Sequence, residues 1–390
     1  MKFLSKESIY SIHSIHGVII SRIPLWLASI ILILTLQPAK AQSTQNLREE
    51  INEIITYQTI NNDLGKLPIH ALIIDGDSEF FINTQSQKTD TSYLDSLFCL
   101  GGASKIYAGL LLSFWHHENK LLLTDSIKIS PNTGTNTFTT TLKSLAIHTS
   151  GLPKIPNNLA LYQMPGHHPY EYYPVKALDS CIHQSAINNK NEYLYSDLGY
   201  AFIEYYLSSR LPKNINLNHY IGPLFPSIFS NTYIHNPAEE LVLQGFDRTG
   251  RKVGPEKSMI FGLSRTAYTS LRDLKSLADL YFNDYITQNH SWLWYFQEPE
   301  YQYHIDEKEN FFSSLGWHLL KIDNQFTILI QGGVSEGNSC FIAILPETQT
   351  AVFLLSNQPV SLNSLGIKIM RMINRNWSKE KIKREQKKEN

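Results

Sequence analysis

The sequence predicts an α/β protein of the α+β type, in which an antiparallel β-sheet is built from both ends of the chain and a mainly helical region is inserted between them. Strand-like apolar segments separated by turn residues occur at 69–84 and again at 326–356. A segment at 104–118 that is apolar on almost every side is typical of a buried helix. Because strands lie at both ends and helices between them, we expect one sheet, flanked by helices.

The expected elements follow in chain order. The first two strands form a hairpin, since the residues between them, Asp75-Gly76-Asp77-Ser78, are turn formers. The strands are expected at 69–74, 79–84, 326–330, 340–345 and 351–356. A later segment, 362–377, has the pattern of an amphipathic helix that covers the sheet.

Length and composition indicate a globular protein. The 390 residues are 42% apolar and 18% charged, which supplies ample material for a core. The 34 basic residues nearly balance the 35 acidic ones, so the chain lacks the positive excess of nucleic-acid-binding proteins, and we expect no nucleic-acid partner. The cysteines Cys99, Cys181 and Cys340 are too far apart for a CxxC metal pair, while a single disulfide stays open.

The first 41 residues have the pattern of an export signal. An apolar run at 23–36 follows basic residues, and Ala39-Lys40-Ala41 offers a small-residue cleavage site. The alternative is a single membrane anchor, but the run is shorter than the ~20 residues that a spanning helix needs. We therefore expect an exported protein, periplasmic or secreted, with no membrane span after cleavage.

Four regions are expected from the distribution of these patterns along the chain. They are the signal peptide at 1–41, a sheet-containing α/β region at 42–100 plus 305–378, a mainly helical region at 101–304 and a charged tail at 379–390.

The buried helix begins with a single charge. Lys105 lies in its first turn, although the helix dipole disfavours a cation there and burial without a partner costs several kcal/mol. Lys105 is therefore either a snorkelling or ion-paired lysine or a lysine of a functional site.

Four segments share an order and spacing with a known superfamily. They are Phe98–Lys105, Leu121–Asp125, Thr141–Pro153 and Tyr195–Tyr200. Together with weaker matches farther along, they resemble the penicillin-recognising serine hydrolases, namely class C β-lactamases, D,D-peptidase-like proteins and β-lactamase-related esterases. The resemblance extends over roughly 68–360 and implies the β-lactamase/transpeptidase-like fold.

The chemistry of that superfamily needs a serine one helical turn before a lysine, so that both side chains share a helix face and the lysine can take the hydroxyl proton. A tyrosine relays the proton, and a Lys/His-x-Gly strand segment lines the opposite wall. By resemblance, the matching positions are Gly102 for the serine, Lys105 for the lysine, Tyr195 for the tyrosine and Gln331–Gly333 for the strand. A glycine therefore stands at the nucleophile position.

Further departures from the pattern affect the same cleft. Ser104 lies next to Lys105 and about 100° around the helix from it, which disfavours Ser104 as a replacement nucleophile. Asp197 replaces an asparagine and would favour the charged form of Lys105, unless it merely caps a helix. Gln331 can bind a ligand by hydrogen bonds but brings no charge. The candidate binding residues are Gly102, Asp197, Gln331 and Gly333, and the candidate catalytic residues are Lys105, Tyr195 and Ser104.

Three functional hypotheses remain, and enzyme activity is left open. The favoured one is an exported β-lactamase-related protein that has lost catalysis and binds a peptide- or ester-like cell-envelope ligand or a protein partner. The alternative is an active hydrolase or acyltransferase in which Lys105 and Tyr195 transfer protons and Ser104 or a bound water replaces the nucleophile. In the third, the cleft is vestigial and the surface is a protein-interaction module. No cofactor or metal is expected, because His116 and His117 point apart and no metal or nucleotide motif is present.

Overall fold

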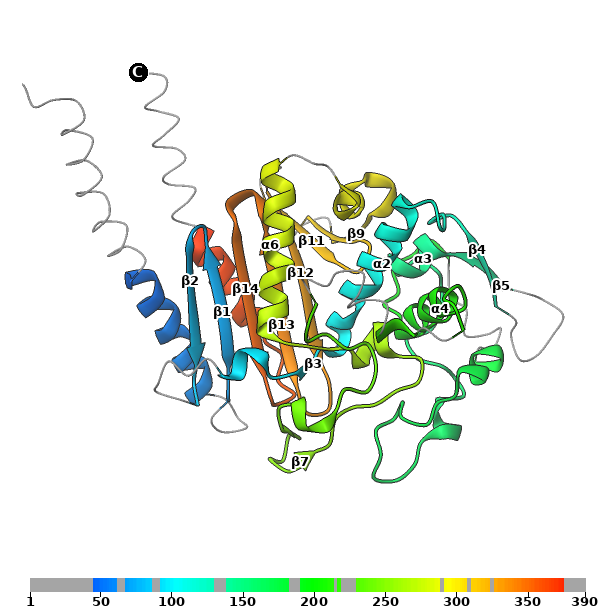
Figure 1. Cartoon of the computed structure of the whole chain (residues 1–390), viewed down its shortest axis with the longest axis horizontal. Coiled ribbons are helices and arrows are strands. Elements are labelled where there is room, and N and C mark those ends of the chain that lie inside the picture. Colours follow the sequence, from blue (N-terminus) through cyan, green and yellow to red (C-terminus); the bar gives the residue numbers. More distant parts are fainter. Residues whose placement is uncertain are drawn as a thin grey trace, which may run out of the picture. The chain divides into compact units, whose positions relative to one another are not determined.

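In the computed structural model, strands from the two ends of the chain meet in one antiparallel sheet (Figure 1). The structure describes residues 45–61, 67–85, 92–129, 138–181, 190–213, 216–218, 229–287, 291–306, 310–322 and 326–374. The expected signal peptide and charged tail lie outside the described residues.

Among the described residues, eight strands form the main sheet, in the spatial order β2-β1-β14-β13-β12-β11-β10-β9. Their bounds are β1 His70–Asp75, β2 Ser78–Asn83, β9 Tyr303–Asp306, β10 Phe311–Ser313, β11 His318–Ile322, β12 Phe326–Val334, β13 Ser339–Leu345 and β14 Thr350–Ser356. All neighbouring pairs are antiparallel, and β1 pairs with β14 from His70 opposite Leu355 to Asp75 opposite Thr350. The expected sheet from both ends of the chain is confirmed.

The sequence of the central strands reflects burial on both faces. Every residue of β13 and β14 is buried, which explains why these strands are continuous apolar runs rather than alternating ones. The β1–β2 hairpin closes through Gly76, whose φ of 57° lies in the left-handed region that glycine adopts readily. The strands predicted at both ends therefore form where the sequence places them.

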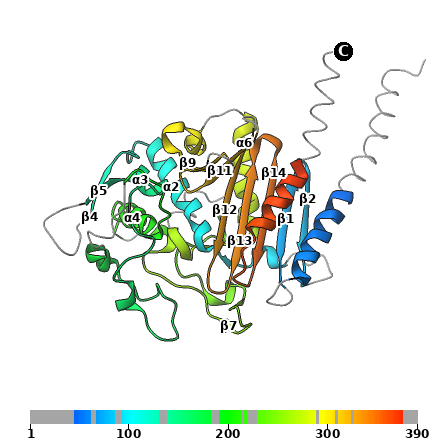
Figure 2. The same ribbon diagram turned by 180° about the vertical axis from the view of Figure 1, so that it is seen from behind.

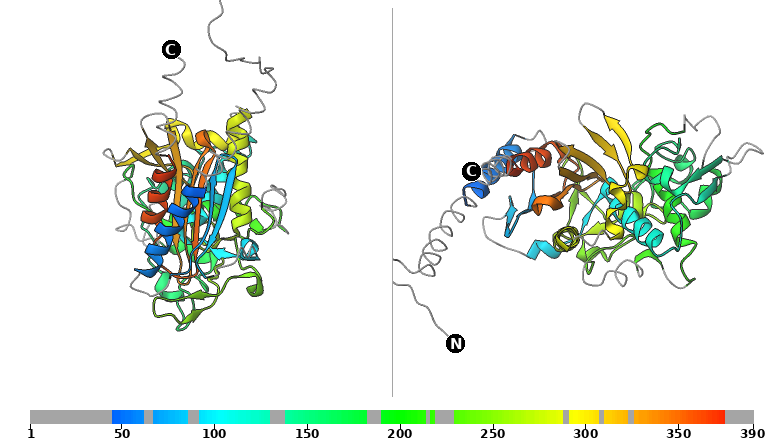
Figure 3. Two further views of the ribbon diagram at one scale, coloured as in Figure 1. Left: turned by 90° about the vertical axis from the view of Figure 1, so that its left-hand side faces the viewer. Right: turned by 90° about the horizontal axis from the view of Figure 1, so that it is seen from above.

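Helices cover both faces of the sheet. Helix α6, Leu271–Thr287, lies on one face, and a helix at 363–374 lies on the other beside the segment 49–60 of the first described helix (Figures 2 and 3). Gly366 in the helix at 363–374 lies so close to the ring of Phe341 on β13 that a Cβ would not fit between them. The predicted C-terminal helix is thus present and packs on the sheet.

Between the two groups of strands the chain is mainly helical, with short strand pairs. The longer helices are α2 Lys105–His117, α3 Leu142–Ala146 and α4 Asp197–Ser208, and the described chain also contains helices at 45–60 and 217–218. The short strands are β3 Phe98–Cys99 paired with β8 Tyr268–Thr269, β4 Ser126–Ile129 with β5 Phe138–Thr141, and β6 Gly245–Phe246 with β7 Lys252–Val253. Single turns of tighter or wider helix are η1 Ser92–Asp95, η2 Gly101–Ser104, η3 Leu159–Tyr162, η4 Val175–Ser180, η6 Glu239–Leu241, η7 Gly262–Thr266, η8 Trp292–Gln297, η9 Pro299–Tyr301 and η10 Pro346–Thr348. Within the described ranges, no helix is both long enough and apolar enough to cross a bilayer.

Helix α2 is the predicted buried helix, and close packing fixes its start. Gly109, in the middle of α2, touches the backbone carbonyl of Leu315 so closely that a side chain there would collide with it. Gly333 on β12 lies equally close to the carbonyl of Leu100, just before η2. These contacts hold the start of α2 against the sheet, and they set the position of every side chain that projects from its first turn.

Candidate active site

The candidate site forms where the starts of α2 and α4 meet η2 and strand β12. Lys105 is the first residue of α2, Asp197 is the first residue of α4, and Tyr195 precedes Asp197 by two residues. Ser196 caps α4, because its hydroxyl accepts a hydrogen bond from the Gly199 N–H at 2.9 Å. The alternative reading of Asp197 as the helix cap is therefore wrong, and its carboxylate turns to Lys105 instead.

Gly102 lies in η2, and the hydroxyl of Tyr195 occupies the space beside it. A Cβ built on Gly102 would be 2.7 Å from Tyr195 Oη and 3.4 Å from the Gly332 carbonyl oxygen. The first of these distances is shorter than ordinary contact between non-bonded atoms. A side chain at the position that the superfamily pattern assigns to the nucleophile would therefore require the Tyr195 hydroxyl to move.

Lys105 is fully buried and makes three hydrogen bonds. Its Nζ donates to Asp197 Oδ1 at 2.6 Å, to Tyr195 Oη at 2.8 Å and to the Ser264 carbonyl at 2.9 Å. Three acceptors match the three N–H groups of an ammonium ion. Burial lowers the pKa of Lys105, while the adjacent carboxylate of Asp197 opposes that shift.

Asp197 is held as a carboxylate by two cations. Its Oδ1 pairs with Lys105, and its Oδ2 lies 3.3 Å from Arg265 NH1. Burial raises the pKa of Asp197, but the charges of Lys105 and Arg265 outweigh burial and hold that pKa below its ordinary value. Asp197 therefore neutralises the lysine that the superfamily chemistry would use as a base.

Arg265 extends the pair into a network of four charged groups. Its NH2 lies 3.7 Å from Glu256 Oε1, and its guanidinium carbon lies 5.0 Å from the centre of the Tyr170 ring. Burial raises the pKa of Glu256, and Arg265 opposes that shift. With one lysine, one arginine and two carboxyl groups, the network largely cancels its own charge.

Tyr195 is positioned as a neutral phenol. Its ring packs on the imidazole of His148, with centroids 4.6 Å apart, and Lys105 Nζ lies 4.6 Å from the ring centre. Burial raises the pKa of Tyr195 well above its ordinary value, and the charge of Asp197 adds to the shift. A phenol of this kind donates a hydrogen bond but is a poor proton acceptor at neutral pH.

Two imidazoles flank Tyr195 and Lys105. His148 Nδ1 accepts a hydrogen bond from the Ser196 N–H at 3.1 Å, and His318 Nε2 lies 3.1 Å from Tyr193 Oη. Burial and the positive charge of Lys105 lower the pKa of His148, and they lower that of His318 to about 4. Both rings are therefore neutral near pH 7, and His148 serves to hold the chain before α4.

Ser104 is fully buried and takes part in backbone contacts. Its hydroxyl donates to the Gly101 carbonyl at 2.7 Å and accepts from the Ala267 N–H at 3.1 Å. The first contact lies within η2, and the second joins η2 to the chain that follows η7. This geometry offers no support for Ser104 as a nucleophile.

The strand residues shape the wall of the site. Gln331 is buried, and its Nε2 donates to the Gly316 carbonyl at 2.8 Å. Gly333 is the close-approach residue that lets β12 pass the Leu100 carbonyl. The structure thus brings Gly102, Lys105, Tyr195 and Asp197 together, while it places Gln331 and Gly333 in packing contacts beside them.

Sequence reasoning missed the residues that complete the network. Arg265, Glu256 and the carbonyl of Ser264 come from segments that matched no motif. The available signal was weak, namely a single arginine in an otherwise apolar and small-residue stretch at 260–267.

A cleft of about 750 Å³ opens beside this site. It is lined by Gly166, His167, His168, Asp247, Arg248, Thr249, Arg251, Lys252, Val253, Gly254, Val334, Ser335, Glu336 and Pro359. The backbone of Val334 lies 2.7 Å from the point where Gly101 would carry a Cβ. Val334, which lines the cleft, therefore packs against the residue that precedes Gly102.

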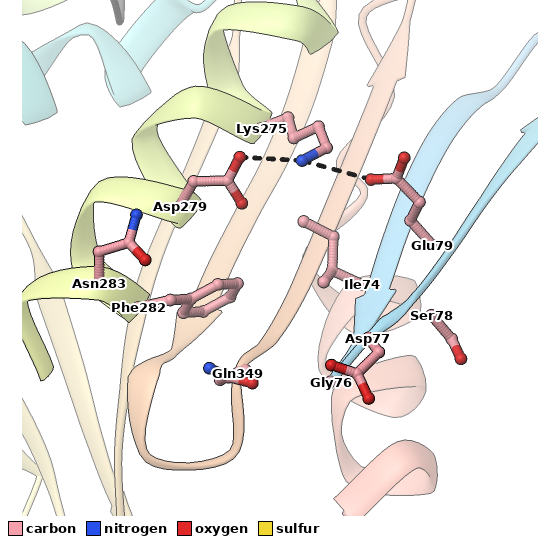
Figure 4. Close-up of a pocket in the computed structure, with 10 residues that line it drawn as sticks. All are labelled: Ile74, Gly76, Asp77, Ser78, Glu79, Lys275, Asp279, Phe282, Asn283 and Gln349. Carbon is pink, nitrogen blue, oxygen red and sulfur yellow. Dashed lines mark hydrogen bonds and ion pairs between the residues drawn. The ribbon is translucent and has the colours of Figure 1, made fainter. Parts of the chain in front are cut away.

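A second cavity, of about 380 Å³, lies at the turn of the β1–β2 hairpin and against α6 (Figure 4). Lys275 Nζ lies 2.8 Å from Asp279 Oδ2 and 3.4 Å from Glu79 Oε2, and the ring of Phe282 forms part of the wall. Three of its charged side chains, Glu79, Lys275 and Asp279, therefore form ion pairs within the cavity wall.

Of the three cysteines, Cys99 borders the site, since its Sγ lies 3.6 Å from Glu256 Oε2. No disulfide joins Cys99, Cys181 and Cys340, all three of which are described and buried. In the described part of the chain, no group of three or more His, Cys, Asp or Glu side chains is arranged to hold a metal ion.

Comparison with known proteins identifies the fold. No protein-family model and no curated protein sequence matches the chain. Solved structures do: a β-lactamase/D-alanine carboxypeptidase from Pseudomonas syringae is 16% identical with a TM-score of 0.64, and the match covers 85% of this chain and 99% of that one. A class C β-lactamase from Rhodobacter sphaeroides is 16% identical with a TM-score of 0.61, over 85% and 99% of the two chains. The octameric penicillin-binding protein homologue from Pyrococcus abyssi is 16% identical with a TM-score of 0.62, over 85% of this chain and 77% of that one.

The chain therefore has the β-lactamase/transpeptidase-like fold, as the sequence predicted. At these identities the likeness concerns the fold, and activity has to be argued from the site itself.

Proposed function

We propose that this chain is an exported, non-hydrolysing relative of the β-lactamases and penicillin-binding proteins, which binds a peptide- or ester-like ligand of the cell envelope, or a protein partner, without forming an acyl-enzyme. One observation carries the proposal: Tyr195 Oη lies 2.7 Å from the point where Gly102 would carry a Cβ. A serine at that position would need the space that the tyrosine hydroxyl fills.

The charges around Lys105 support the same conclusion. A general base must present a lone pair to the hydroxyl that it deprotonates. All three acceptors around Lys105 Nζ suit an ammonium ion, and one of them is a carboxylate at 2.6 Å. The lysine is therefore committed to an ion pair rather than to proton transfer.

The second candidate function is an active hydrolase or acyltransferase with an unusual nucleophile. The observation in its favour is that Lys105 Nζ and Tyr195 Oη remain in hydrogen-bond contact at 2.8 Å. In that case Ser104 or a bound water would attack the substrate, with Lys105 and Tyr195 moving protons. The hydrogen bonds of Ser104 to Gly101 and Ala267 count against the serine version.

The test is intact-protein mass spectrometry after incubation with a fluorophosphonate and with a fluorescent penicillin. We expect no adduct on the wild-type protein and no turnover of a chromogenic acyl ester, while an active class C β-lactamase run alongside acquires the label. An adduct on the wild-type protein would overturn the proposal, and peptide mapping would then identify the nucleophile.

Two glycine variants refine the result. Gly102→Ser restores the serine next to Lys105, and Gly254→Ser places a serine in open space in the cleft, away from Lys105. Labelling of Gly102→Ser alone would mean that the site lacks only its nucleophile. Absence of labelling from both variants would mean that the Lys105–Asp197 pair has also removed the base.

A further inference from the structure

The cleft beside Gly101 has the size of a site for a small organic ligand. Pockets for such ligands range over about 300–1,000 Å³, and this one measures about 750 Å³. Three segments form its walls: the loop at 166–168, the β6–β7 hairpin region at 247–254 and the turn at 334–336.

The carboxylates that line the cleft are already paired. Asp247 contacts Arg251 through both Nε and NH2, each at 3.0 Å, and accepts hydrogen bonds from the turn backbone. Glu336 Oε2 lies 2.6 Å from His168 Nδ1. Asp247 is therefore already balanced by Arg251, and Glu336 lies against His168.

Two cationic side chains in the β6–β7 hairpin region have no such partner. Arg248 and Lys252 are exposed, and within the described ranges neither side chain has an ion-pair or hydrogen-bond partner. The lining thus carries three cationic side chains, Arg248, Arg251 and Lys252, against the two carboxylates of Asp247 and Glu336, and this excess of positive charge attracts anions.

Resting on the proposed non-covalent function, we infer that this cleft binds an organic ligand with at least two carboxylates and the size of a short acidic peptide, and that Arg248 and Lys252 anchor it. An inorganic anion is much smaller than the cavity, so the volume favours an organic ligand.

Glu336 occupies a place that a ligand carboxylate could take. His168 contacts Glu336 on one ring nitrogen and the Gly254 carbonyl, at 3.0 Å, on the other. Glu336 is 44% exposed, whereas His168 is 11% exposed. The more exposed partner of the pair is therefore the carboxylate, which a ligand can replace beside a ring that also contacts the Gly254 carbonyl.

The test is isothermal titration calorimetry of the full-length protein with acetyl-Glu-Glu-Glu and with the neutral acetyl-Gln-Gln-Gln amide. We expect the acidic peptide to bind more tightly than the neutral peptide, and we expect its binding to weaken as the salt concentration is raised.

The double variant Arg248→Glu/Lys252→Glu should bind the acidic peptide with an affinity that is lower by about tenfold or more. The control Lys128→Glu/Lys176→Glu carries the same change in charge at exposed positions outside the cleft and should bind as the wild type does. Glu336→Gln should tighten binding several-fold, because it removes the competitor for His168.

Failure to bind the acidic peptide, equal binding of both peptides, or equal weakening in the cleft and control variants would overturn the inference. These outcomes are independent of the labelling experiment. An adduct on the wild-type protein overturns the proposed function, whereas loss of charge-dependent peptide binding overturns only the assignment of the ligand.

Discussion

His235 Nε2 lies 2.7 Å from Glu204 Oε1, and the other oxygen of this fully buried carboxylate accepts a hydrogen bond from the Leu263 N–H at 2.7 Å. His235 Nδ1 lies 3.2 Å from the Ser258 carbonyl, so both ring nitrogens face oxygen acceptors. Glu204 ties α4 to η7 through its hydrogen bond from Leu263, and η7 supplies the carbonyl of Ser264 and the guanidinium of Arg265 to the site. His235 contacts the same carboxylate from outside the charged network.

The first prediction concerns the pH dependence of this contact. Although burial lowers the pKa of His235, Glu204 outweighs burial and holds that pKa above its ordinary value of about 6.5. Because the pKa of His235 is higher in the folded protein than in the unfolded chain, its protonation stabilises the fold. This contribution is fully present below about pH 6.5 and is lost as the pH rises through the pKa of the folded state. Urea unfolding should show that the stability difference between wild type and His235→Gln shrinks from pH 6 to pH 9. His304→Gln, at an exposed position on β9, is the control, and an equal slope in both variants would contradict the prediction.

The second prediction concerns the Lys105–Asp197 pair. Removing one partner leaves the other as a buried charge, which costs about 3–5 kcal/mol. Asp197→Leu and Lys105→Met should each destabilise the protein strongly, while the double variant should be more stable than either single variant. Arg265 keeps Glu256 as a partner when Asp197 is removed. The measurement is the free energy of unfolding in urea for the wild type, the two single variants and the double variant. If the destabilisation of the double variant equals the sum of those of the single variants, the two side chains do not form a buried ion pair.

The third prediction tests the crowding at Gly102. Because Tyr195 Oη stands 2.7 Å from the Cβ position, Gly102→Ala should destabilise the protein by about 1–3 kcal/mol. In a Tyr195→Phe background, which lacks the hydroxyl, Gly102→Ala should destabilise the protein less. Thermal unfolding of the four proteins provides the comparison. An equal effect of Gly102→Ala in both backgrounds would mean that the tyrosine does not fill the site.

The fourth prediction concerns His70, a buried residue at the start of β1. Its ring lies 5.0 Å from that of Tyr93 and 5.4 Å from that of Phe98, and among the described residues neither ring nitrogen has a hydrogen-bond partner. Burial lowers the pKa of His70 to about 4. Between about pH 6.5 and pH 4, His70 is therefore protonated in the unfolded chain but neutral in the folded chain. The free energy of unfolding falls by up to about 3 kcal/mol as the pH is lowered through this range. His70→Leu should flatten this part of the stability curve, and an unchanged acid slope would show that His70 does not cause it.

The sequence was most informative where a pattern depends only on neighbouring residues. β13 and β14 are continuous apolar runs, and α2 is apolar almost throughout, so their local composition suffices to predict them. β9, β10 and β11 escaped prediction because they are short, and β9 alternates between half-buried and exposed positions without a run of apolar residues. Each is held by pairing with its neighbours, β9 with β10, β10 with β11 and β11 with β12.

The site was predictable only as far as its motif extended. The spacing of Gly102, Lys105 and Tyr195 identified three of its members. Arg265 could not be placed, since its partners Asp197 and Glu256 are brought to it by tertiary packing alone. Likewise, the hydrogen bond of Gln331 to the Gly316 carbonyl depends on how β12 passes a neighbouring loop, and the sequence did not indicate it. The ligand-binding role of Gln331 stays a prediction.

The pairing of β1 with β14 has a consequence for how the chain folds while it is being synthesised. The hairpin β1–β2 is synthesised among the first parts of the described chain and its partner strand among the last. Contacts of such long sequence separation slow folding, because the loop between the strands must close before they gain any stability. Until β14 emerges, β1 presents an open apolar edge of the kind that pairs with other chains and aggregates. A nascent chain of this protein therefore has to be kept apart from its neighbours until its final strand is complete, and truncation before Thr350 should yield aggregates rather than a smaller folded protein.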